Sequence, residues 1–346
     1  MAEILADPGF VRHFSDHMAI ATWSRDAGWH DSRIQNYQSF DMAPGSGVLH
    51  YAQEIFEGMK AYRHPDGSVW LFRPQMNARR LNLSAERLAM PELPEPDFLT
   101  SVLALIRADQ DWVPPADASY YIRPFMFADQ EFMGVRSATR FTYAVIGGPA
   151  SAYMGDGVTP VDILVTTTHS RTASGGTGAV KCGGNYAASL IAQREGARYG
   201  CSQVLFTDAS THQWVEELGG MNFFVVTSDN RLVTPPTSGT ILAGITRDSI
   251  LTIAPGLGLT PVTEPISLAA MLADIAQGRI TEAFACGTAA GVTPIGCLVR
   301  ANDGQVTRTE LAPRVGEATL AIRQAIIDIQ YGETADEFGW MLKVVE

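Results

Sequence analysis

The sequence predicts an α+β fold divided into two domains, and three observations support this prediction. The chain has 346 residues, which exceeds the usual size of one hydrophobic core. Some segments repeat apolar residues with a helical period and others are short β-branched runs, without strict alternation between them. Because helical and strand-like segments do not alternate strictly, the sequence does not predict a doubly wound sheet. A turn-rich stretch of small residues, 147–152, places the boundary between domains of residues 1–150 and 151–346.

The first domain is predicted to combine strands with two helices after an extended lead-in of forty residues. Strands are predicted at residues 69–72, 120–127 and 141–146, and helices at residues 74–88 and 98–106. The first helix begins at Pro74, after the turn signal at residues 64–67, and prolines follow its end. The second helix is predicted because its apolar positions share one face: Phe98, Val102, Leu105 and Ile106.

The second domain is predicted to surround a glycine-rich loop at residues 175–184. Strands are predicted at residues 161–168, 204–207, 222–227 and 283–286, and helices at residues 185–199, 246–253, 268–275 and 316–329. In the helix after the loop, we expect the apolar residues to face inward: Ala187, Leu190, Ile191 and Ala197.

Composition and charge exclude several classes of function. The net charge is -12 and the pI is about 5.0, whereas nucleic acids and anionic membranes attract clustered positive charge. No apolar run approaches the ~20 residues of a membrane span, and residues 1–17 lack a signal-peptide pattern. The four cysteines form no C-x-x-C pair, which indicates reduced thiols and a cytoplasmic protein.

The glycine-rich loop contains Lys181, whose neighbours exclude two common phosphate motifs. Val180 precedes the lysine and Cys182 follows it, so a Walker loop does not match, and a dinucleotide fingerprint fails because its third glycine is absent. No metal site is predicted, since His13 and His17 have metal-like spacing but no partner ligand. Lys181 is either a solvated loop residue or a desolvated nucleophile towards a carbonyl group.

The segment from Gly175 to Leu190, and much of the chain between Tyr51 and Tyr331, resembles the branched-chain aminotransferases. These are fold-type IV enzymes dependent on pyridoxal 5'-phosphate and similar to D-amino-acid aminotransferase. The resemblance implies a small N-terminal α/β domain, a larger C-terminal α/β domain and a homodimer. It also implies transfer of the amino group of L-leucine, L-isoleucine or L-valine to 2-oxoglutarate, which gives branched-chain 2-oxo acids and L-glutamate.

By this resemblance, Lys181 is the catalytic residue, because it carries the cofactor as a Schiff base and moves the substrate proton. Glu217, in the stretch 215–222, matches the carboxylate that pairs with the pyridine nitrogen, and Glu216 is then a surface acid. Tyr186 matches the tyrosine that contacts the phenolic oxygen. The resemblance assigns the remaining cofactor contacts, most of them to the phosphate, to Arg80, Gly220, Ile245, Thr246 and Thr288.

The resemblance places the substrate pocket mainly in the first domain. Its residues are Tyr51, Phe56, Gly58, Tyr121, Arg123, Tyr153, Thr288 and Ala289. Most would line an apolar cavity for a branched side chain, although Phe56 is equally well a core aromatic. Arg123 would bind the distal carboxylate of glutamate, and strand alternation places it on the same face as Tyr121. The backbone of Thr288 and Ala289 would hold the substrate α-carboxylate.

Departures from the family pattern concern specificity rather than the central chemistry. Met154 stands where phenylalanine is common, Ala243 replaces a common proline, and Gly220 replaces a hydroxyl residue of some members. The redox C-x-x-C of some members is absent. Rival functions are a D-amino-acid aminotransferase, an aminodeoxychorismate lyase, or a non-catalytic cofactor-binding protein. The Tyr121 and Arg123 pair argues against the first two, and retention of Lys181 with Glu217 argues against the third.

Overall fold

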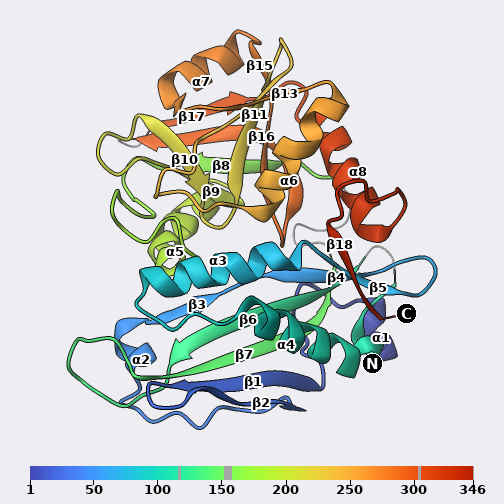
Figure 1. The fold of residues 1–346 in the computed structure, drawn as a ribbon. Coiled ribbons are helices and arrows are strands. Elements are labelled where there is room, and N and C mark those ends of the chain that lie inside the picture. Colours follow the sequence, from blue (N-terminus) through green and yellow to red (C-terminus); the bar gives the residue numbers. More distant parts are fainter. Residues whose placement is uncertain (116–117, 152–157, 303–304, 346) are drawn as a thin grey trace. The chain divides into compact units, whose positions relative to one another are not determined.

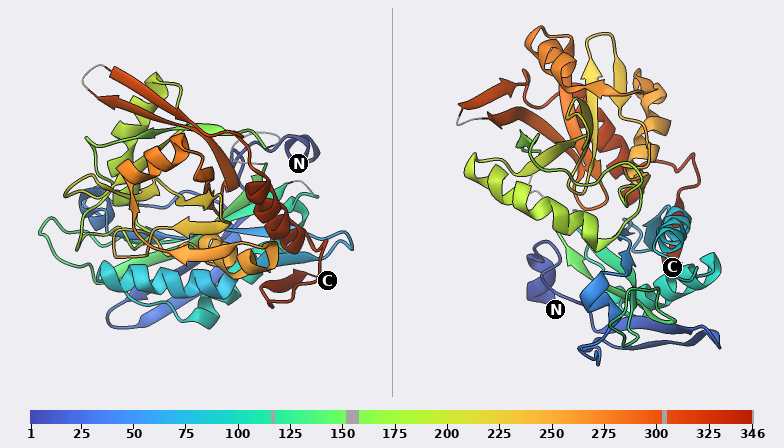
Figure 2. Two further views of the ribbon diagram at one scale, coloured as in Figure 1. Left: turned by 90° about the horizontal axis from the view of Figure 1, so that it is seen from above. Right: turned by 90° about the vertical axis from the view of Figure 1, so that its left-hand side faces the viewer.

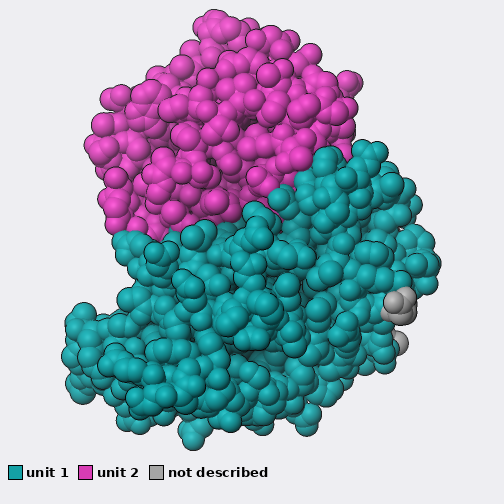
Figure 3. Space-filling view, in the orientation of Figure 1, with its two compact units in different colours: residues 1–153, 180–183, 328–346 teal, residues 154–179, 184–327 magenta. Residues whose placement is uncertain are grey.

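The computed structural model describes residues 1–115, 118–151, 158–302 and 305–345, and the chain forms two compact units (Figure 3). Unit 1 contains Met1–Tyr153, Val180–Gly183 and Asp328–Glu346, and unit 2 contains Met154–Ala179 and Gly184–Ile327. A single cut in the chain would therefore not separate the two units. The division of the sequence into two domains at residue 150 stays a prediction.

Unit 1 is built on an eight-stranded sheet in the order β18-β5-β4-β6-β7-β1-β2, with β3 paired to β6 (Figure 1). Its strands are β1 (His17–Ser24), β2 (Gly28–Asn36), β3 (Glu54–Phe56), β4 (Met59–Arg63), β5 (Val69–Phe72), β6 (Ser119–Ala128), β7 (Arg140–Ala150) and β18 (Met341–Val345). Its helices are α1 (Ala2–Ala6), α2 (Gly47–Tyr51), α3 (Pro74–Arg87), α4 (Glu95–Ala108) and the 3-10 turn η1 (Gln110–Trp112).

Helices α3 and α4 form where the sequence predicts them. Pro74 occupies the first turn of α3, where its missing N–H would have no helical partner. Helix α4 buries the four apolar residues predicted to share one face, namely Phe98, Val102, Leu105 and Ile106. The core of unit 1 also includes Val180 and Cys182. The short segment around Lys181 is thus packed into this core.

Two predictions in this unit are wrong. The supposed lead-in forms the antiparallel hairpin of β1 and β2, and β1 continues the sheet by pairing with β7. Residues 147–150 are not a turn, because β7 extends to Ala150 and pairs with β6 along its whole length. Their small size has a packing reason: a side chain at Gly148 would collide with the carbonyl oxygen of His13.

Unit 2 contains a ten-stranded sheet in the order β13-β12-β11-β15-β16-β8-β9-β10-β14, with β17 paired to β16. The long ribbon of β16 and β17 is visible in both views of Figure 2. The strands are β8 (Val161–Val165), β9 (Gln203–Thr207), β10 (Trp214–Leu218), β11 (Asn222–Thr227), β12 (Arg231–Thr234), β13 (Thr260–Thr263), β14 (Ile266–Ser267), β15 (Ile280–Gly287), β16 (Gly291–Asn302) and β17 (Gln305–Glu310). The helices are α5 (Gly183–Arg198), α6 (Ile245–Ile253), α7 (Leu268–Ala276), α8 (Glu317–Tyr331) and the 3-10 turn η2 (Ala254–Leu257). The first residue of α5 and the end of α8 from Asp328 belong to unit 1.

Helix α5 presents a different face inward from the one predicted. Its buried residues are Asn185, Ser189, Ala192 and Gly196, whereas Leu190 and Ile191 are 60% and 43% exposed and Ala187 and Ala197 also face outward. Small residues let the helix approach the sheet closely. A β-carbon added to Gly196 would lie 3.4 Å from atoms of Leu164 and Val204, so apolar periodicity alone selected the wrong side.

The predicted α+β class is confirmed, since each unit contains a mixed set of helices and strands and neither alternates strictly between them. All four cysteines are buried and free. Over the described ranges, no helix combines the length and apolar character needed to cross a membrane.

Candidate functional site

The backbone of Lys181 is fixed by two elements of unit 1. Its amide donates a hydrogen bond to the hydroxyl of Ser84 on α3 at 3.0 Å. Its carbonyl oxygen accepts a hydrogen bond from the amide of Phe56, at the end of β3, at 3.0 Å. Two residues later, the Gly183 amide donates to a carboxylate oxygen of Glu54. The lysine is thus held in one place, unlike a solvated residue of a mobile loop.

The side chain of Lys181 is in an environment that favours the neutral amine. Its Nζ lies 4.9 Å from the centre of the Phe56 ring. Burial and the positive charges of Arg80 and Arg123 lower the pKa of Lys181, and Glu57 and Tyr121 act in the opposite direction. Together these effects give a pKa of about 8. With a pKa of about 8, roughly a tenth of the amine is unprotonated at neutral pH, far more than for an ordinary lysine, and this neutral form is the nucleophile towards carbonyls.

Arg80 is held in a buried ion pair with Glu57. Its Nε and Nη2 donate to the two carboxylate oxygens of Glu57 at 2.7 and 2.8 Å. The side chain of Arg80 is 9% exposed and that of Glu57 is fully buried. Asn77 donates a third hydrogen bond to Glu57 at 2.8 Å. The guanidinium plane of Arg80 is therefore fixed by a fork-like contact that a lysine could not make.

Four residues predicted for the substrate pocket lie together near Lys181. Arg123 donates from Nη2 to the Tyr121 hydroxyl at 3.1 Å, and its Cζ lies 4.6 Å from the centre of the Phe56 ring. Tyr121 and Arg123 thus share one face of β6, as strand alternation predicts. Gly58 lies against Tyr121, where a side chain would collide with the hydroxyl. Glycine at this position therefore leaves room for the tyrosine.

The other residues predicted for the pocket from this part of the chain differ in position. Tyr51 ends α2; its hydroxyl contacts the carbonyl oxygen of Met133, and its ring stacks on Phe132 with 5.8 Å between centres. Its contacts are thus with the segment that links β6 to β7. Tyr153 and the neighbouring Met154 lie outside the described residues.

In unit 2, Glu217 on β10 is contacted by one ion-pair partner and two hydrogen-bond donors. Arg171 Nη2 lies 2.6 Å from its Oε1, and the Leu242 amide donates to the same oxygen at 3.0 Å. Asn222 donates to Oε2 at 3.0 Å. The side chains of Arg171 and Glu217 are each 4% exposed. A cation and two neutral donors stabilise the ionised form of this buried carboxylate.

The neighbouring Glu216 is in a different environment. It is buried rather than on the surface as predicted, and its Oε2 has no hydrogen-bond partner among the described residues. Burial raises the pKa of Glu216, against the opposing effects of the Thr240 hydroxyl and Arg171. Of the two adjacent acids, Glu217 is the one that makes direct contact with a buried cation.

Four further predicted residues lie at two turns of unit 2. Helix α6 begins at Ile245 after Gly244, so Ile245 and Thr246 are in its first turn, where backbone N–H groups lack helical acceptors. Thr288 and Ala289 form part of the turn between β15 and β16. Such turns suit an anion because the N–H groups and the helix dipole supply positive potential.

Tyr186 is near the start of α5, and its ring lies beside Gly220 of the turn after β10. A β-carbon added to Gly220 would be 3.2 Å from the Tyr186 ring. The hydroxyl residue that some family members carry at this position would therefore press on the tyrosine ring, and glycine removes that contact.

Sequence reasoning missed four residues that fix the predicted groups: Glu57, Asn77, Ser84 and Arg171. One feature of the sequence could have indicated a role for Glu57: it is an acidic residue within the otherwise apolar stretch around Phe56 and Gly58. No such feature marked Arg171, since it pairs with a residue 46 positions away only in the folded chain.

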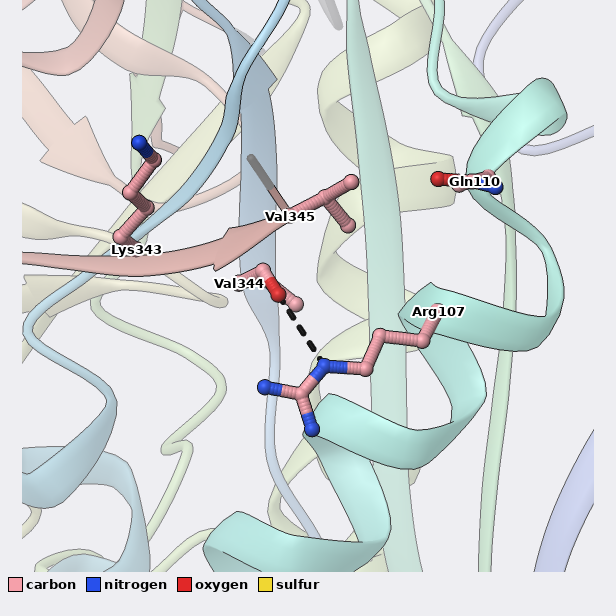
Figure 4. Close-up of a pocket in the computed structure, with 5 residues that line it drawn as sticks. All are labelled: Arg107, Gln110, Lys343, Val344 and Val345. Carbon is pink, nitrogen blue, oxygen red and sulfur yellow. Dashed lines mark hydrogen bonds between the residues drawn. The ribbon is translucent and has the colours of Figure 1, made fainter.

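A separate cavity of about 430 Å³ lies near the C-terminal strand of unit 1 (Figure 4). It is lined by Arg107, Gln110, Lys343, Val344 and Val345. Arg107 donates from Nε to the carbonyl oxygen of Val344 at 3.1 Å. None of these residues belongs to the group around Lys181.

Comparisons with known proteins agree with one another. A family model described as amino-transferase class IV matches residues 54–296. The chain is 48% identical to a probable branched-chain-amino-acid aminotransferase of Streptomyces coelicolor, over 98% of this chain and 93% of that protein. It is 46% identical to the branched-chain-amino-acid aminotransferase of Mycolicibacterium smegmatis, over 99% of this chain and 93% of that protein.

The fold is similar to that of solved structures. The branched-chain amino acid aminotransferase of Escherichia coli superposes with a TM-score of 0.76 at 26% identity, covering 96% of this chain and 100% of that chain. A thermophilic archaeal enzyme, from Thermoproteus uzoniensis and solved with norvaline, gives a TM-score of 0.77 at 25% identity, covering 94% of this chain and 99% of that chain.

Proposed function

Since the chain belongs to the class IV aminotransferases, and within them to the branched-chain-amino-acid aminotransferases, we propose that it transfers the amino group of L-leucine, L-isoleucine or L-valine to 2-oxoglutarate. The products are branched-chain 2-oxo acids and L-glutamate. The cofactor is pyridoxal 5'-phosphate, which when bound supplies an electron sink for the carbanion at the substrate α-carbon. The observation that carries the proposal is Lys181, an amine with its pKa lowered to about 8 on a fixed backbone.

The residues of each unit fit this cofactor. In unit 1, Lys181 offers the amine that attaches the aldehyde, and Arg80 offers a buried cation for the phosphate. In unit 2, the first turn of α6, at Ile245 and Thr246, and the turn at Thr288 offer backbone or hydroxyl donors of the kind that bind a phosphate. Tyr186, beside Gly220, would donate to the phenolic oxygen.

Glu217 is proposed to pair with the ring nitrogen. A carboxylate in this role must be ionised, because it favours the protonated ring nitrogen on which the electron sink depends. The ion pair with Arg171 and the two hydrogen bonds to Glu217 support an ionised and oriented carboxylate. The unpartnered oxygen and raised pKa of Glu216 support the choice of Glu217 over its neighbour.

Lys181 is proposed to have a second task as the group that moves the substrate proton. Once the incoming amino acid displaces it, its amine is free to accept the proton from the α-carbon and to return it. A lowered pKa suits this task, because proton transfer in both directions is most efficient when the pKa lies near the working pH.

The substrate side chain is proposed to contact Phe56, Gly58 and Tyr121, and Tyr51 and Tyr153 are assigned to the same pocket by resemblance alone. Thr288 and Ala289 are proposed to hold the α-carboxylate. Arg123 would bind the distal carboxylate of glutamate. Its contact with Tyr121 and its position over the Phe56 ring support this role, because they hold the cation within a largely apolar group.

A homodimer and a cytoplasmic location complete the proposal. Exposed apolar side chains at Leu49, Met133 and Val135, which are 59%, 85% and 88% exposed, support a surface that a second copy covers. Size-exclusion chromatography with light scattering measures the mass directly. The four buried free thiols are consistent with a reducing compartment.

The decisive experiment is an amino-donor screen with 2-oxoglutarate as acceptor and the purified, cofactor-loaded protein. We expect glutamate formation from L-leucine, L-isoleucine and L-valine, and none from the D-enantiomers. Turnover of D-alanine or D-glutamate in place of the L-substrates would identify a D-amino-acid aminotransferase. Release of pyruvate from aminodeoxychorismate would identify a lyase.

A further inference from the structure

Arg171 is the buried cation of unit 2 that contacts Glu217. It lies after β8 and before the glycine-rich loop, at 6% exposure. Its Nη2 is 2.6 Å from Oε1 of Glu217 and also donates to the carbonyl oxygens of Gly178, at 3.0 Å, and Thr240. All three contacts are made through this one nitrogen, and Nε is buried without a hydrogen-bond partner among the described residues.

The contact determines the charge state and the orientation of Glu217. A buried carboxylate without a cation tends to take up a proton, because burial penalises the charged form. An ion pair at this distance opposes that tendency and restricts rotation of the carboxylate. The Leu242 amide and Asn222 complete the hydrogen bonding, but both are neutral.

Two other ionisable groups influence the same carboxylate. Arg247 on α6 acts on Glu217 through its charge, and its Nη2 donates to the Pro235 carbonyl at 3.0 Å. Burial raises the pKa of the Cys286 thiol on β15, so this group is neutral at physiological pH. Arg171 is the cation whose direct ion pair with Glu217 the structure records.

We propose that Arg171 is a positioning residue of the transamination reaction, acting through Glu217 to keep that carboxylate ionised and aimed at the ring nitrogen of the cofactor. This inference rests on the proposed function, in which Glu217 pairs with that nitrogen. Arg171 also holds the backbone carbonyls of Gly178 and Thr240, so the test must separate its effect through Glu217 from its effect on this backbone.

The test is a double-mutant cycle of Arg171→Gln and Glu217→Gln, with Arg171→Lys as the conservative variant. We expect Arg171→Gln to lower kcat with leucine by about ten- to a hundredfold, with a smaller change in KM, because one buried ion pair with the carboxylate is lost. The apoprotein should bind pyridoxal 5'-phosphate more weakly, as measured by absorbance titration. Arg171→Lys should recover most of both losses, because it retains the charge.

The cycle separates action through Glu217 from general damage. In the Glu217→Gln background, adding Arg171→Gln should change kcat and cofactor affinity by about twofold or less. A matched control, Arg231→Gln, removes the partly exposed pair with Glu264 and should leave both quantities at their original values. Circular dichroism on each apoprotein checks folding, and Arg171→Lys keeps the inference testable if Arg171→Gln does not fold.

Two results would overturn the inference while leaving the proposed function intact. One is a crippled Glu217→Gln beside an Arg171→Gln enzyme with unchanged kcat and cofactor affinity. The other is an equal loss from Arg171→Gln in both backgrounds, or an Arg171→Lys enzyme as impaired as Arg171→Gln. Normal turnover in Glu217→Gln would instead remove the proposed role of Glu217 itself.

Discussion

Arg123 donates a hydrogen bond to the hydroxyl of Tyr121, two residues away on the same strand, at 3.1 Å. The same guanidinium lies over the ring of Phe56, at 4.6 Å from its centre. Its Nε is buried and has no hydrogen-bond partner among the described residues. A cation held in this way beside apolar groups offers a binding partner for a carboxylate without obstructing an aliphatic side chain.

Arg123→Gln should therefore separate the two amino donors. A charge-assisted contact contributes roughly 1.5–3 kcal/mol, so kcat/KM for glutamate and 2-oxoglutarate should fall by about ten- to a hundredfold, at ~1.4 kcal/mol per decade. The half-reaction with leucine should change far less. Single-turnover kinetics with each donor measure this difference, and equal losses would show that Arg123 only supports the fold.

Replacement of Lys181 by alanine should abolish steady transamination and the visible absorbance of the attached cofactor. The cofactor should still bind through its phosphate contacts, so the protein is not expected to lose it entirely. Lys343→Ala, which removes a lysine that lies over the Trp70 ring in unit 1, serves as control and should keep its activity. Wild-type turnover in Lys181→Ala would rule out the assignment.

The attachment of cofactor to the apoprotein should depend on pH in a defined direction. The pKa of Lys181 is lowered from 10.5 to about 8, and only the neutral amine attacks a carbonyl. Attachment should therefore accelerate as the pH rises and reach half of its maximal rate near pH 8. Stopped-flow absorbance measures it, and a midpoint near that of an ordinary lysine would contradict the observed environment.

Glu217→Gln should retain the cofactor but lose most of its rate. An amide does not favour the protonated ring nitrogen, so the loss should appear in kcat more than in KM. The matched variant is Glu216→Gln, which alters the adjacent acid and should have the smaller effect. Near-normal kcat in Glu217→Gln, together with a crippled Glu216→Gln, would reverse the assignment of the two residues.

Glu57→Gln tests the buried pair with Arg80. Removal of one partner from a buried ion pair destabilises a protein by about 3–5 kcal/mol, because it leaves an uncompensated charge. We expect a loss of about this size in the free energy of unfolding, measured by urea denaturation of the apoprotein. Glu95→Gln disrupts the exposed pair with Arg79 and should cost less than about 1 kcal/mol.

The grouping of some candidate site residues could be predicted from the sequence, whereas their roles stay predictions. Phe56, Gly58, Tyr121 and Arg123 lie together near Lys181 in unit 1, as the resemblance implied. Partners brought together only by folding were not visible. Glu57 pairs with Arg80, 23 positions later in the chain, and Arg171 pairs with Glu217, 46 positions later. Neither pairing follows from a periodic pattern in the sequence.

The errors in secondary structure have physical causes. Strand β2 is exposed along much of its length at the edge of the sheet, so it lacks the apolar alternation that identifies a half-buried strand. In α5, close packing against the sheet requires small side chains, so the buried face carries Ser189 and Gly196 rather than leucine. Apolar periodicity identified the helix but gave the wrong orientation.

The segment Val180–Gly183 belongs to unit 1 although the chain on both sides of it belongs to unit 2. A recombinant fragment ending at Ala150 would therefore lack its own nucleophile, as well as two side chains of its core, Val180 and Cys182. It would also lack β18, which leaves β5 as an unpaired edge. If the gene were split at that point, the two fragments would regain activity only by reassociating. A circular permutant would have to keep Val180–Gly183 connected on both sides to unit 2.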